Sequence, residues 1–262
     1  MHSQINFGYP WIFTYGHLFV AAPALAIFLV SWARKRNKVV LGVSGALALW
    51  ALTAFAMLRF GFDMNGRATM PTQAFLTSGA AAKVLDMGAG TGRSTLMVLE
   101  ARPQTTVVAL DSFSDSYTEH FGNAKSGQTV EDRGRAKLIA NMKAAGVEER
   151  ATIQPGDMRH MPFEAGTFDA IVSAYAIDHL SREGSSQAIG EAYRVLKPHG
   201  EFLLMVIAKD LWLDLTYGPM LVHMRAAASG YWESRMRNAG FDIIESGHRP
   251  FTHYVVARKP GA

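Results

Sequence analysis

The chain has no cysteine among its 262 residues. This absence excludes disulfides, thiolate metal ligands and a cysteine nucleophile. Charge is also scarce, at 18% of residues, and the formal net charge of +4 equals the four basic residues within 34–38. A single local cluster is not the basic stripe of a nucleic-acid-binding protein, so we expect no nucleic acid as a partner.

Two runs near the N-terminus lack charge almost completely. Residues 10–33 carry none, and residues 39–60 carry only Arg59. Each run exceeds the ~20 residues that a helix needs to cross the hydrocarbon core of a bilayer. We therefore predict a two-helix transmembrane hairpin over residues 1–61, with the membrane as a partner. The alternatives are a buried hairpin of a soluble protein and a signal peptide. A signal peptide fits badly, because no basic segment precedes the run and the run is too long.

Two arguments about the orientation of this hairpin disagree. Positive residues favour the cytoplasmic side, which would place the basic connection 34–38 inside and both termini outside. The cofactor inferred below is cytosolic. We therefore expect a two-pass protein whose catalytic domain faces the cytoplasm, with the basic connection as an exception or the hairpin not fully spanning. Small residues four apart, Ala22/Ala26 and Gly42/Ala46, are candidates for close helix contact.

Residues 62–82 are predicted to be a linker with a short helix over 71–78, and residues 83–262 to form one α/β domain. Apolar runs and turn residues alternate regularly in this domain. The alternation predicts a doubly wound, mostly parallel, seven-stranded sheet whose last two strands form an antiparallel edge pair. The predicted strands are 83–87, 106–110, 151–154, 168–174, 201–208, 241–246 and 252–259. The predicted helices are 93–101, 131–145, 185–196 and 229–238.

A glycine-rich turn follows the first predicted strand, with glycine at positions 88, 90 and 92. Such glycines allow unusual backbone angles and a close approach of backbone to a ligand. The dinucleotide fingerprint would require a further glycine where the chain has Arg93. Asp86 precedes the turn and suits a cationic or zwitterionic ligand better than a pyrophosphate. The alternative is a tight strand-to-helix turn that binds nothing.

Two more acids end the next two strands. Asp111 is placed to accept hydrogen bonds from both hydroxyls of a ribose, and Asp157 to meet an adenine amine, with Met158 as an apolar contact to the ring. Each acid alone is also consistent with a solvated residue in a loop. Ligands of open α/β sheets bind at the carboxyl ends of the strands. Asp86, Asp111 and Asp157 together therefore predict a site for an adenosine that carries a positive amino-acid tail.

Four ordered motifs carry a family resemblance: VLDMGAGTG, VVALD, GDMRHMPFEAGTFDAIVSAYAIDHL and AYRVLKPHGEFLL. They resemble class I S-adenosylmethionine-dependent methyltransferases, most of all the type that includes ubiquinone/menaquinone biosynthesis methyltransferases. The resemblance covers about residues 83–208, and more loosely extends to 259. It departs from the family at His199, where glycine is frequent, and in the extra length of 112–130.

The resemblance implies S-adenosylmethionine as cofactor and a role for each matching residue. Gly88, Gly90 and Gly92 would carry the methionine and ribose portion, with Asp86 beneath the methionine end. Asp111 would hold the ribose, and Asp157 with Met158 the adenine. Ala174 and Tyr175 would face the methionyl moiety.

Asp178 and His179 are the candidate catalytic residues, since they follow the fourth strand beside the expected methyl group. A general base assists when the acceptor is a hydroxyl or an ammonium. The alternative is that His179 caps a loop and Asp178 is solvated. His120, His223 and Tyr217 lie in the variable loops and are expected to be packing or surface residues. We expect no metal, because Lys209-Asp210 is not the Asp-Asn pair of a metal-assisted site.

The apolar segment 211–221 admits three interpretations: a lining for the acceptor pocket, a contact with the membrane interface, or an internal helix of a cap. We hypothesise a small-molecule or lipid acceptor that partitions into membranes, such as a quinone precursor, an amine-headgroup lipid or a lipophilic thiol. A non-catalytic S-adenosylmethionine-binding membrane sensor or scaffold is the alternative function. A nicotinamide oxidoreductase is disfavoured by Arg93 and Asp86. The sequence carries no signal for an oligomeric state.

Overall fold

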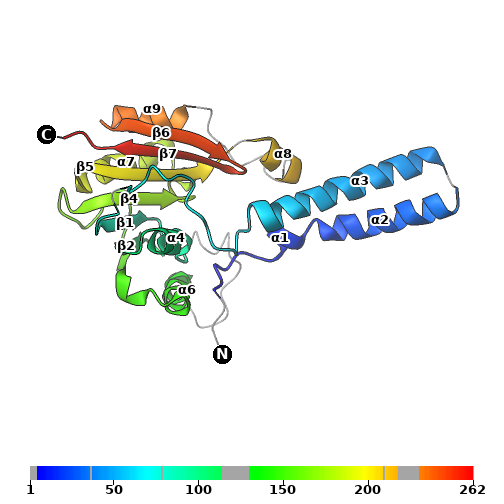
Figure 1. Cartoon of the computed structure of the whole chain (residues 1–262), viewed down its shortest axis with the longest axis horizontal. Coiled ribbons are helices and arrows are strands. Elements are labelled where there is room, and N and C mark those ends of the chain that lie inside the picture. The colour runs from blue at the N-terminus through cyan, green and yellow to red at the C-terminus, as the bar shows by residue number, and fades with distance from the viewer. Residues whose placement is uncertain are drawn as a thin grey trace. The chain divides into compact units, whose positions relative to one another are not determined.

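The computed structural model describes residues 5–35, 37–77, 79–113, 130–208, 210–217 and 230–261, with backbone only for 130–133. These residues form two compact units (Figure 1). The first contains described residues 5–8, 65–208 and 230–261, and the second contains those from 9 to 64 and from 210 to 217. This division differs from the predicted boundaries in three places. Residues 5–8 belong with the α/β unit, residues 210–217 belong with the hairpin, and the predicted linker 62–82 is divided between the two units at residue 64.

The α/β unit is built on one seven-stranded sheet of order β3-β2-β1-β4-β5-β7-β6 (Figure 1). The first five strands in the chain run parallel, and β7 pairs antiparallel with both β5 and β6. The fold prediction is confirmed, including the antiparallel pair of the last two strands at one edge of the sheet, with β6 outermost; β3 lies at the other edge. The strand bounds are β1 Lys83–Met87, β2 Thr106–Asp111, β3 Ala151–Pro155, β4 Phe168–Ala174, β5 Leu196–Ile207, β6 Asp242–Arg249 and β7 Thr252–Arg258.

Helices cover both faces of this sheet. The helices are α4 Arg93–Ala101, α6 Val130–Ala145, α7 Arg182–Val195 and α9 Tyr231–Asn238. Successive residues of a strand point to opposite faces. On β1, Asp86 contacts α4, whereas Leu85 and Met87 belong to the core that contains Ile189 of α7. Helices α4 and α7 therefore pack on opposite faces, and β1 is buried between them.

The start of α7 and the start of β5 both differ from the predicted bounds. Helix α7 begins at Arg182 because Ser181 caps it, accepting a 3.0 Å hydrogen bond from the Gly184 N–H. Strand β5 begins at Leu196 because the chain keeps pairing through an irregular stretch, where the His199 N–H donates to Lys259 O at 3.0 Å. His199 has a φ of 63° there. A left-handed backbone favours glycine, which accounts for glycine as the frequent family residue.

The predicted helix over 71–78 is wrong for its described part, residues 71–77, which contains neither helix nor strand. Side chains from elsewhere satisfy its backbone instead. Arg102 donates to the carbonyls of Phe75 and Leu76, and Glu201 accepts from the Leu76 N–H at 2.7 Å. Phe75 is fully buried. These tertiary contacts outweigh the weak local helix preference of the segment.

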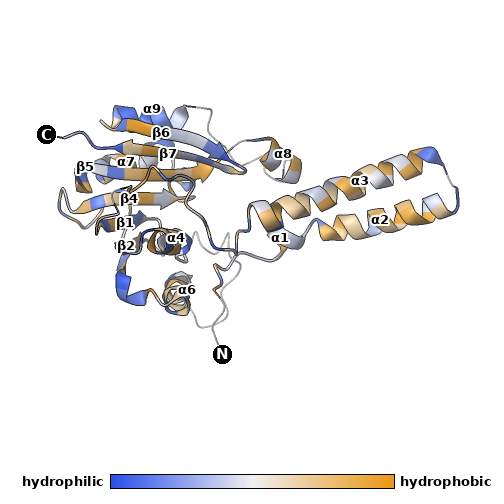
Figure 2. Ribbon diagram, viewed as in Figure 1, coloured by the Kyte–Doolittle hydropathy of each residue, from blue (hydrophilic) through white to orange (hydrophobic). Residues whose placement is uncertain are grey.

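The second unit is a helical hairpin with a short third helix. It contains α1 Ile12–Tyr15, α2 Leu18–Ala33, α3 Lys38–Ala56, a π-helical turn η1 Met57–Gly61, and α8 Leu211–Tyr217. Helices α2 and α3 lie side by side and are apolar along most of their length (Figure 2). Two stretches, Ile12–Ala33 and Lys38–Gly61, are long and apolar enough to cross a membrane.

Small residues form the contact between α2 and α3, and large apolar residues face outward. The predicted contact pairs Ala22/Ala26 and Gly42/Ala46 are wrong, because all four residues are exposed. The buried positions are Ala21, Ala24, Ser31, Ser44, Ala48, Ala51 and Ala54. The exposed large side chains include Phe19, Ile27, Leu29, Val30, Val43, Leu47 and Leu49. This arrangement reverses that of a soluble protein and is typical of helices packed in lipid.

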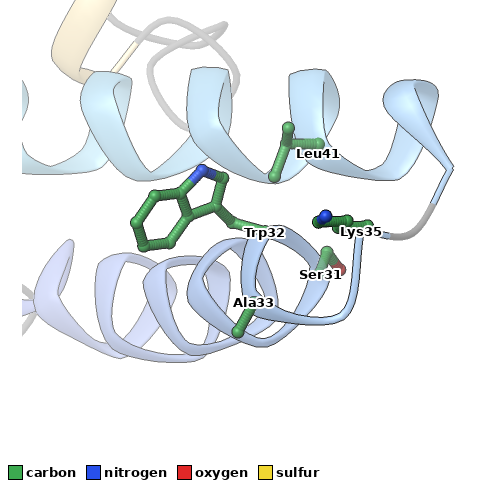
Figure 3. A pocket seen from close by; sticks show the side chains of 5 residues that line it. All are labelled: Ser31, Trp32, Ala33, Lys35 and Leu41. Atoms are coloured by element: carbon green, nitrogen blue, oxygen red, sulfur yellow. The ribbon is translucent and has the colours of Figure 1, made fainter.

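The connecting end of the hairpin combines apolar and basic side chains. A pocket there is lined by Ser31, Trp32 and Ala33 of α2, Lys35 of the connection and Leu41 of α3 (Figure 3). Trp32 is 66% exposed. An exposed tryptophan beside basic residues is typical of a helix end at a membrane–water boundary.

Candidate active site

The glycine-rich turn after β1 adopts a conformation that only glycine permits without strain. Gly88, Gly90 and Gly92 have φ values of 86°, 57° and 90°. A Cβ on Gly88 would lie 2.3 Å from Ala176 Cβ and 2.9 Å from Met158 Cε. The turn therefore approaches the segments that follow β3 and β4, and both the angle and the space require glycine at position 88.

Asp86 lies beneath this turn and is fully buried. Its carboxylate accepts hydrogen bonds from Ser94 Oγ at 2.9 and 2.8 Å and from Thr95 Oγ1 at 2.6 Å. Burial raises the pKa of Asp86 to about 6, although the Thr95 and Ser94 hydrogen bonds lower it. We expected this carboxylate to suit a cationic ligand, but its hydrogen bonds in the structure are made within the fold. Asp86 joins the end of β1 to the first turn of α4, and its oxygens are already engaged.

Asp111 connects the glycine-rich turn to the end of β2. Its Oδ2 accepts from the Gly90 N–H and its Oδ1 from the Phe113 N–H, both at 2.8 Å. The side chain is buried, and β1 and β2 are paired neighbours. A carboxylate oxygen accepts more than one hydrogen bond, so Asp111 retains the capacity to bind hydroxyls at the carboxyl edge of the sheet.

Asp157 and Met158 follow β3 and differ in their surroundings. Asp157 forms an ion pair with Arg159 at 2.6 Å and accepts from the Arg159 N–H at 2.8 Å. The hydrogen bond from the Arg159 side chain lowers the pKa of Asp157. Met158 is half-buried, and its side chain lies beside Gly88. An adenine amine at this position would therefore share Asp157 with Arg159.

Ala174 and Tyr175 end β4, and both are half-buried. Tyr175 has a φ of 53° and donates its N–H to Met205 O at 2.8 Å. Its phenolic oxygen lies 2.5 Å from Thr252 Oγ1. Part of the Tyr175 side chain is therefore directed to the start of β7, a contact that the sequence did not indicate.

Asp178 lies in the short 3-10 turn η3, Ile177–His179, which follows β4. The Ile207 N–H donates to its Oδ2 at 3.3 Å, while Oδ1 is buried and has no hydrogen-bond partner among the described residues. Burial raises the pKa of Asp178, and the charge of His179 acts in the opposite direction. His179 itself is exposed. Asp178 thus combines a raised pKa with an acceptor oxygen that the fold does not use, which suits a general base.

Two residues of the N-terminal segment, Asn6 and Phe7, help to hold the glycine-rich turn, and the sequence did not indicate this role. Thr91 Oγ1 donates to Phe7 O at 2.9 Å, and Asn141 of α6 donates to Thr91 O at 2.9 Å. Asn141 also exchanges hydrogen bonds with the backbone of Asn6. Phe7 is fully buried. No local pattern indicates contacts between residues so far apart in the chain.

Three further candidates from the sequence were Tyr217, His120 and His223. Tyr217 belongs to the hairpin unit, where its hydroxyl donates to Phe13 O at 2.7 Å. His120 and His223 lie outside the described residues. Within the described part of the chain, no group of three or more His, Asp or Glu side chains is arranged to hold a metal.

Comparison with known proteins matches residues 84–200 to a family described as a methyltransferase domain. One relative is the ubiquinone/menaquinone biosynthesis C-methyltransferase of Bartonella tribocorum, 31% identical over 52% of this chain and 45% of its own length. A second is the demethylmenaquinone methyltransferase of Symbiobacterium thermophilum, 23% identical over 65% of this chain and 58% of its own length. The chain spans about half the length of the curated relatives that it matches.

Solved structures agree on the fold. An S-adenosylmethionine-dependent methyltransferase from Methanosarcina mazei has a TM-score of 0.53 at 15% identity, over 70% of this chain and 94% of that one. The [4+2]-cyclase SpnF has a TM-score of 0.54 at 16% identity, over 72% and 78%. The second example is named for a different reaction, so the fold alone does not determine the chemistry. The ordered motifs, the family match and the sheet together identify residues 84–200 as a class I S-adenosylmethionine-dependent methyltransferase domain.

Proposed function

We propose that this protein is a membrane-anchored methyltransferase that transfers a methyl group from S-adenosylmethionine to a small, lipophilic acceptor. The observation that carries the acceptor class is the outward apolar surface of the hairpin, where small residues are buried and large apolar residues are exposed. A chain held in lipid by such a hairpin encounters membrane-partitioned molecules at high local concentration.

The cofactor site fits S-adenosylmethionine. The glycine-rich turn has no space for a Cβ at Gly88, and Asp111 holds the turn and retains acceptor capacity for ribose hydroxyls. Asp157 and Met158 lie where an adenine would contact a carboxylate and a thioether. The bound cofactor supplies an activated sulfonium methyl, so the protein mainly aligns the acceptor and excludes water.

Asp178 is the residue that we assign to proton removal, with His179 beside it. Its unused Oδ1 is buried at the carboxyl end of β4, next to β5. An acceptor hydroxyl or a ring carbon activated by one becomes a stronger nucleophile when its proton leaves. A general base of this kind contributes roughly 10²–10⁴ in rate. The hydroxyl proton would pass to Asp178 Oδ1, and the resulting oxygen or ring carbon would bond to the methyl carbon as the bond from that methyl to the sulfonium sulfur breaks and S-adenosylhomocysteine leaves. In C-methylation, the ring carbon would then lose its own proton and regain aromaticity.

A quinone precursor is our first choice of acceptor. The relative from Bartonella tribocorum is named for C-methylation in ubiquinone/menaquinone biosynthesis. Such precursors carry a lipophilic tail and a hydroxylated ring, which match the hairpin and Asp178 respectively. Amine-headgroup lipids and lipophilic thiols are the other two classes to test.

The test uses the full-length protein in liposomes with S-adenosylmethionine labelled in its methyl group. We expect label to enter the organic phase after extraction with a hydroxylated quinone precursor, and Asp178→Asn to reduce the rate. Label confined to water-soluble acceptors would contradict the acceptor class. Tight cofactor binding without transfer to any acceptor would favour the alternative, a non-catalytic membrane sensor or scaffold.

Orientation requires its own test. We propose that the α/β unit faces the cytoplasm, because the cofactor is made there, and that the basic connection is an exception to the positive-inside preference. A reporter fused after residue 262 that is active only on the cytoplasmic side would support this topology. Activity on the opposite side would contradict it.

A further inference from the structure

Helix α8 is bound to the hairpin by three hydrogen bonds from different parts of it. His17 Nε2 donates to Thr216 O at 2.8 Å, and Trp50 Nε1 donates to Leu215 O at 2.7 Å. The Tyr217 hydroxyl donates to Phe13 O at 2.7 Å. The carbonyls of a last helical turn lack partners within the helix. Here the hairpin supplies donors to two of them, so α8 is a fixed part of the hairpin unit.

Aromatic packing supports the same contact. The ring of His17 lies 5.5 Å from that of Trp50 and 6.1 Å from that of Tyr217, both in edge arrangements. His17 and Tyr217 are buried. Edge-to-face contacts of this kind add stabilisation beyond the burial of area.

The exposed residues of α8 are two leucines and one acid, Asp214, whose carboxylate would remain at the level of the headgroups. Leu211 is 67% and Leu215 is 41% exposed, while Leu213 and Thr216 are buried. Large aromatic residues are also exposed within a turn or two of the residues that bind α8, namely Trp11, Tyr15 and Phe19. Aromatic side chains of this kind concentrate at the level of the lipid headgroups.

The length of the hairpin beyond α8 limits the depth at which α8 can lie. Helix α2 continues past His17 for 16 residues, which is about 24 Å at 1.5 Å per residue. Along α3, Lys38 to Trp50 spans about 18 Å by the same rise. A hydrocarbon core is about 30 Å thick. Both lengths are shorter than this core, so Arg34 and Lys35 approach the far headgroups only with α8 at the near surface and their side chains extended. With α8 in water away from the bilayer, the basic connection would lie deeper in hydrocarbon.

We propose that α8 is an interfacial helix that lies in the plane of the membrane surface and completes a three-helix lipid-binding unit. Leu211 and Leu215 enter the acyl boundary, and the ends of Arg34 and Lys35 extend to the far headgroups. This inference rests on the proposed insertion of the hairpin.

The absence of cysteine allows a direct test, since a single introduced cysteine can be labelled with an environment-sensitive fluorophore. The labelled variants are Leu215→Cys on α8, Val43→Cys on the outside of α3 and Asp242→Cys on the exposed start of β6. Each is reconstituted in liposomes of phosphatidylcholine and phosphatidylglycerol. Quenching is then compared between aqueous iodide and lipids that carry a quencher at a shallow or a deep position.

We expect the label at position 215 to be protected from iodide at least threefold relative to position 242, and quenched best by shallow lipid quenchers. If position 215 were as accessible to iodide as position 242 while position 43 was in lipid, the interfacial assignment of α8 would be overturned and the insertion of the hairpin would stand. Iodide access at position 43 would overturn hairpin insertion as well. These measurements do not depend on methyl transfer. A failure of the proposed methyltransferase activity is therefore distinguishable from a failure of the interfacial assignment.

A second pair of variants tests whether the hydrogen bonds hold α8. Trp50→Phe keeps a ring but removes the donor to Leu215 O, whereas Trp32→Phe changes a tryptophan at the other end of the hairpin. We expect iodide access at position 215 to rise in Trp50→Phe and to remain unchanged in Trp32→Phe. Equal protection in both variants would overturn the docking of α8 through this bond.

Discussion

The side-chain amide of Asn141 donates a 2.9 Å hydrogen bond to the carbonyl of Thr91, a residue 50 positions earlier in the chain. The same amide binds the backbone of Asn6. Helix α6 thereby fixes both the glycine-rich turn and the segment that precedes the hairpin.

Replacing Asn141 with Ala should weaken cofactor binding and lower stability together. The change leaves the buried carbonyl of Thr91 unpaired, which costs about 1–3 kcal/mol, and it also removes the two bonds to the backbone of the exposed Asn6. Calorimetric titration with S-adenosylhomocysteine and thermal unfolding would measure the two effects. The exposed Asn238→Ala on α9 is the matched control and should change neither. A wild-type affinity in Asn141→Ala would show that the turn does not depend on this bond.

Asp111→Ala should reduce the affinity for S-adenosylhomocysteine by roughly 5- to 150-fold, the equivalent of about 1–3 kcal/mol for lost hydrogen bonds. Both the Gly90 N–H and the ribose hydroxyls would lose an acceptor. Asp242→Ala removes an exposed acid and serves as the control. Equal affinity in the two variants would refute the ribose assignment of Asp111.

Gly88→Ala should abolish cofactor binding or prevent folding. The new Cβ would lie 2.3 Å from Ala176 Cβ at a φ of 86°, so sterics and backbone angle both oppose it. Gly190→Ala on α7 is the opposite case, since its Cβ would meet nothing within 4 Å. It should raise stability by about 0.4–1 kcal/mol. Circular dichroism melts and cofactor titration would compare the two, and a binding-competent Gly88→Ala would contradict the steric account.

Asp86 should make the protein less stable as the pH rises from about 4 to about 6. Its folded pKa of about 6 lies above the ordinary 3.8, so the folded state binds more protons than the unfolded state in this window. The penalty is complete above pH 6 and amounts to about 3 kcal/mol at 1.36 kcal/mol per pKa unit. Urea unfolding at pH 4.5 and pH 7.5 would measure it. Asp86→Asn should lack this pH dependence and Asp242→Asn should retain it; identical slopes in all three would contradict the burial effect.

Asp178 should control the acid limb of the pH–rate profile. A base must be ionised to accept a proton, so kcat/KM should fall as the pH drops through the raised pKa of Asp178, at a higher pH than for an ordinary aspartate. Asp178→Asn should remove this limb and lower kcat by roughly 10²–10⁴. Glu183→Gln, an exposed acid on α7, is the control. An unaltered limb in Asp178→Asn would exclude Asp178 as the base.

The succession of strands and helices along the chain and the acids at the strand ends could be predicted from the sequence, because both follow from local patterns. Apolar runs that end in Asp86, Asp111 and Gly156-Asp157 indicate strands and their carboxyl ends, and the glycines indicate the turn. Contacts between distant residues left no such signal. Asn6 with Asn141 and Tyr175 with Thr252 each depend on how the chain returns to the sheet.

The hairpin also shows what a local pattern cannot supply. Its length and charge were evident, but the predicted contact residues of α2, Ala22 and Ala26, lie one and two positions away from the buried Ala21 and Ala24. Two uniformly apolar helices offer little contrast between faces. The sequence likewise could not decide among three interpretations of the segment that contains α8. The donors that bind α8, such as Trp50, lie far away in the chain.

Among the described residues, the chain passes between its two units four times: between 8 and 9, 64 and 65, 208 and 210, and 217 and 230. The hairpin unit is therefore not one continuous segment, and cutting the chain at residue 61 would not separate the two units. Removing residues 1–61 would also remove Phe7, whose backbone carbonyl accepts a hydrogen bond from the Thr91 hydroxyl. A water-soluble version should instead join Gly8 to Asn65 through a short flexible bridge and replace 209–225 separately.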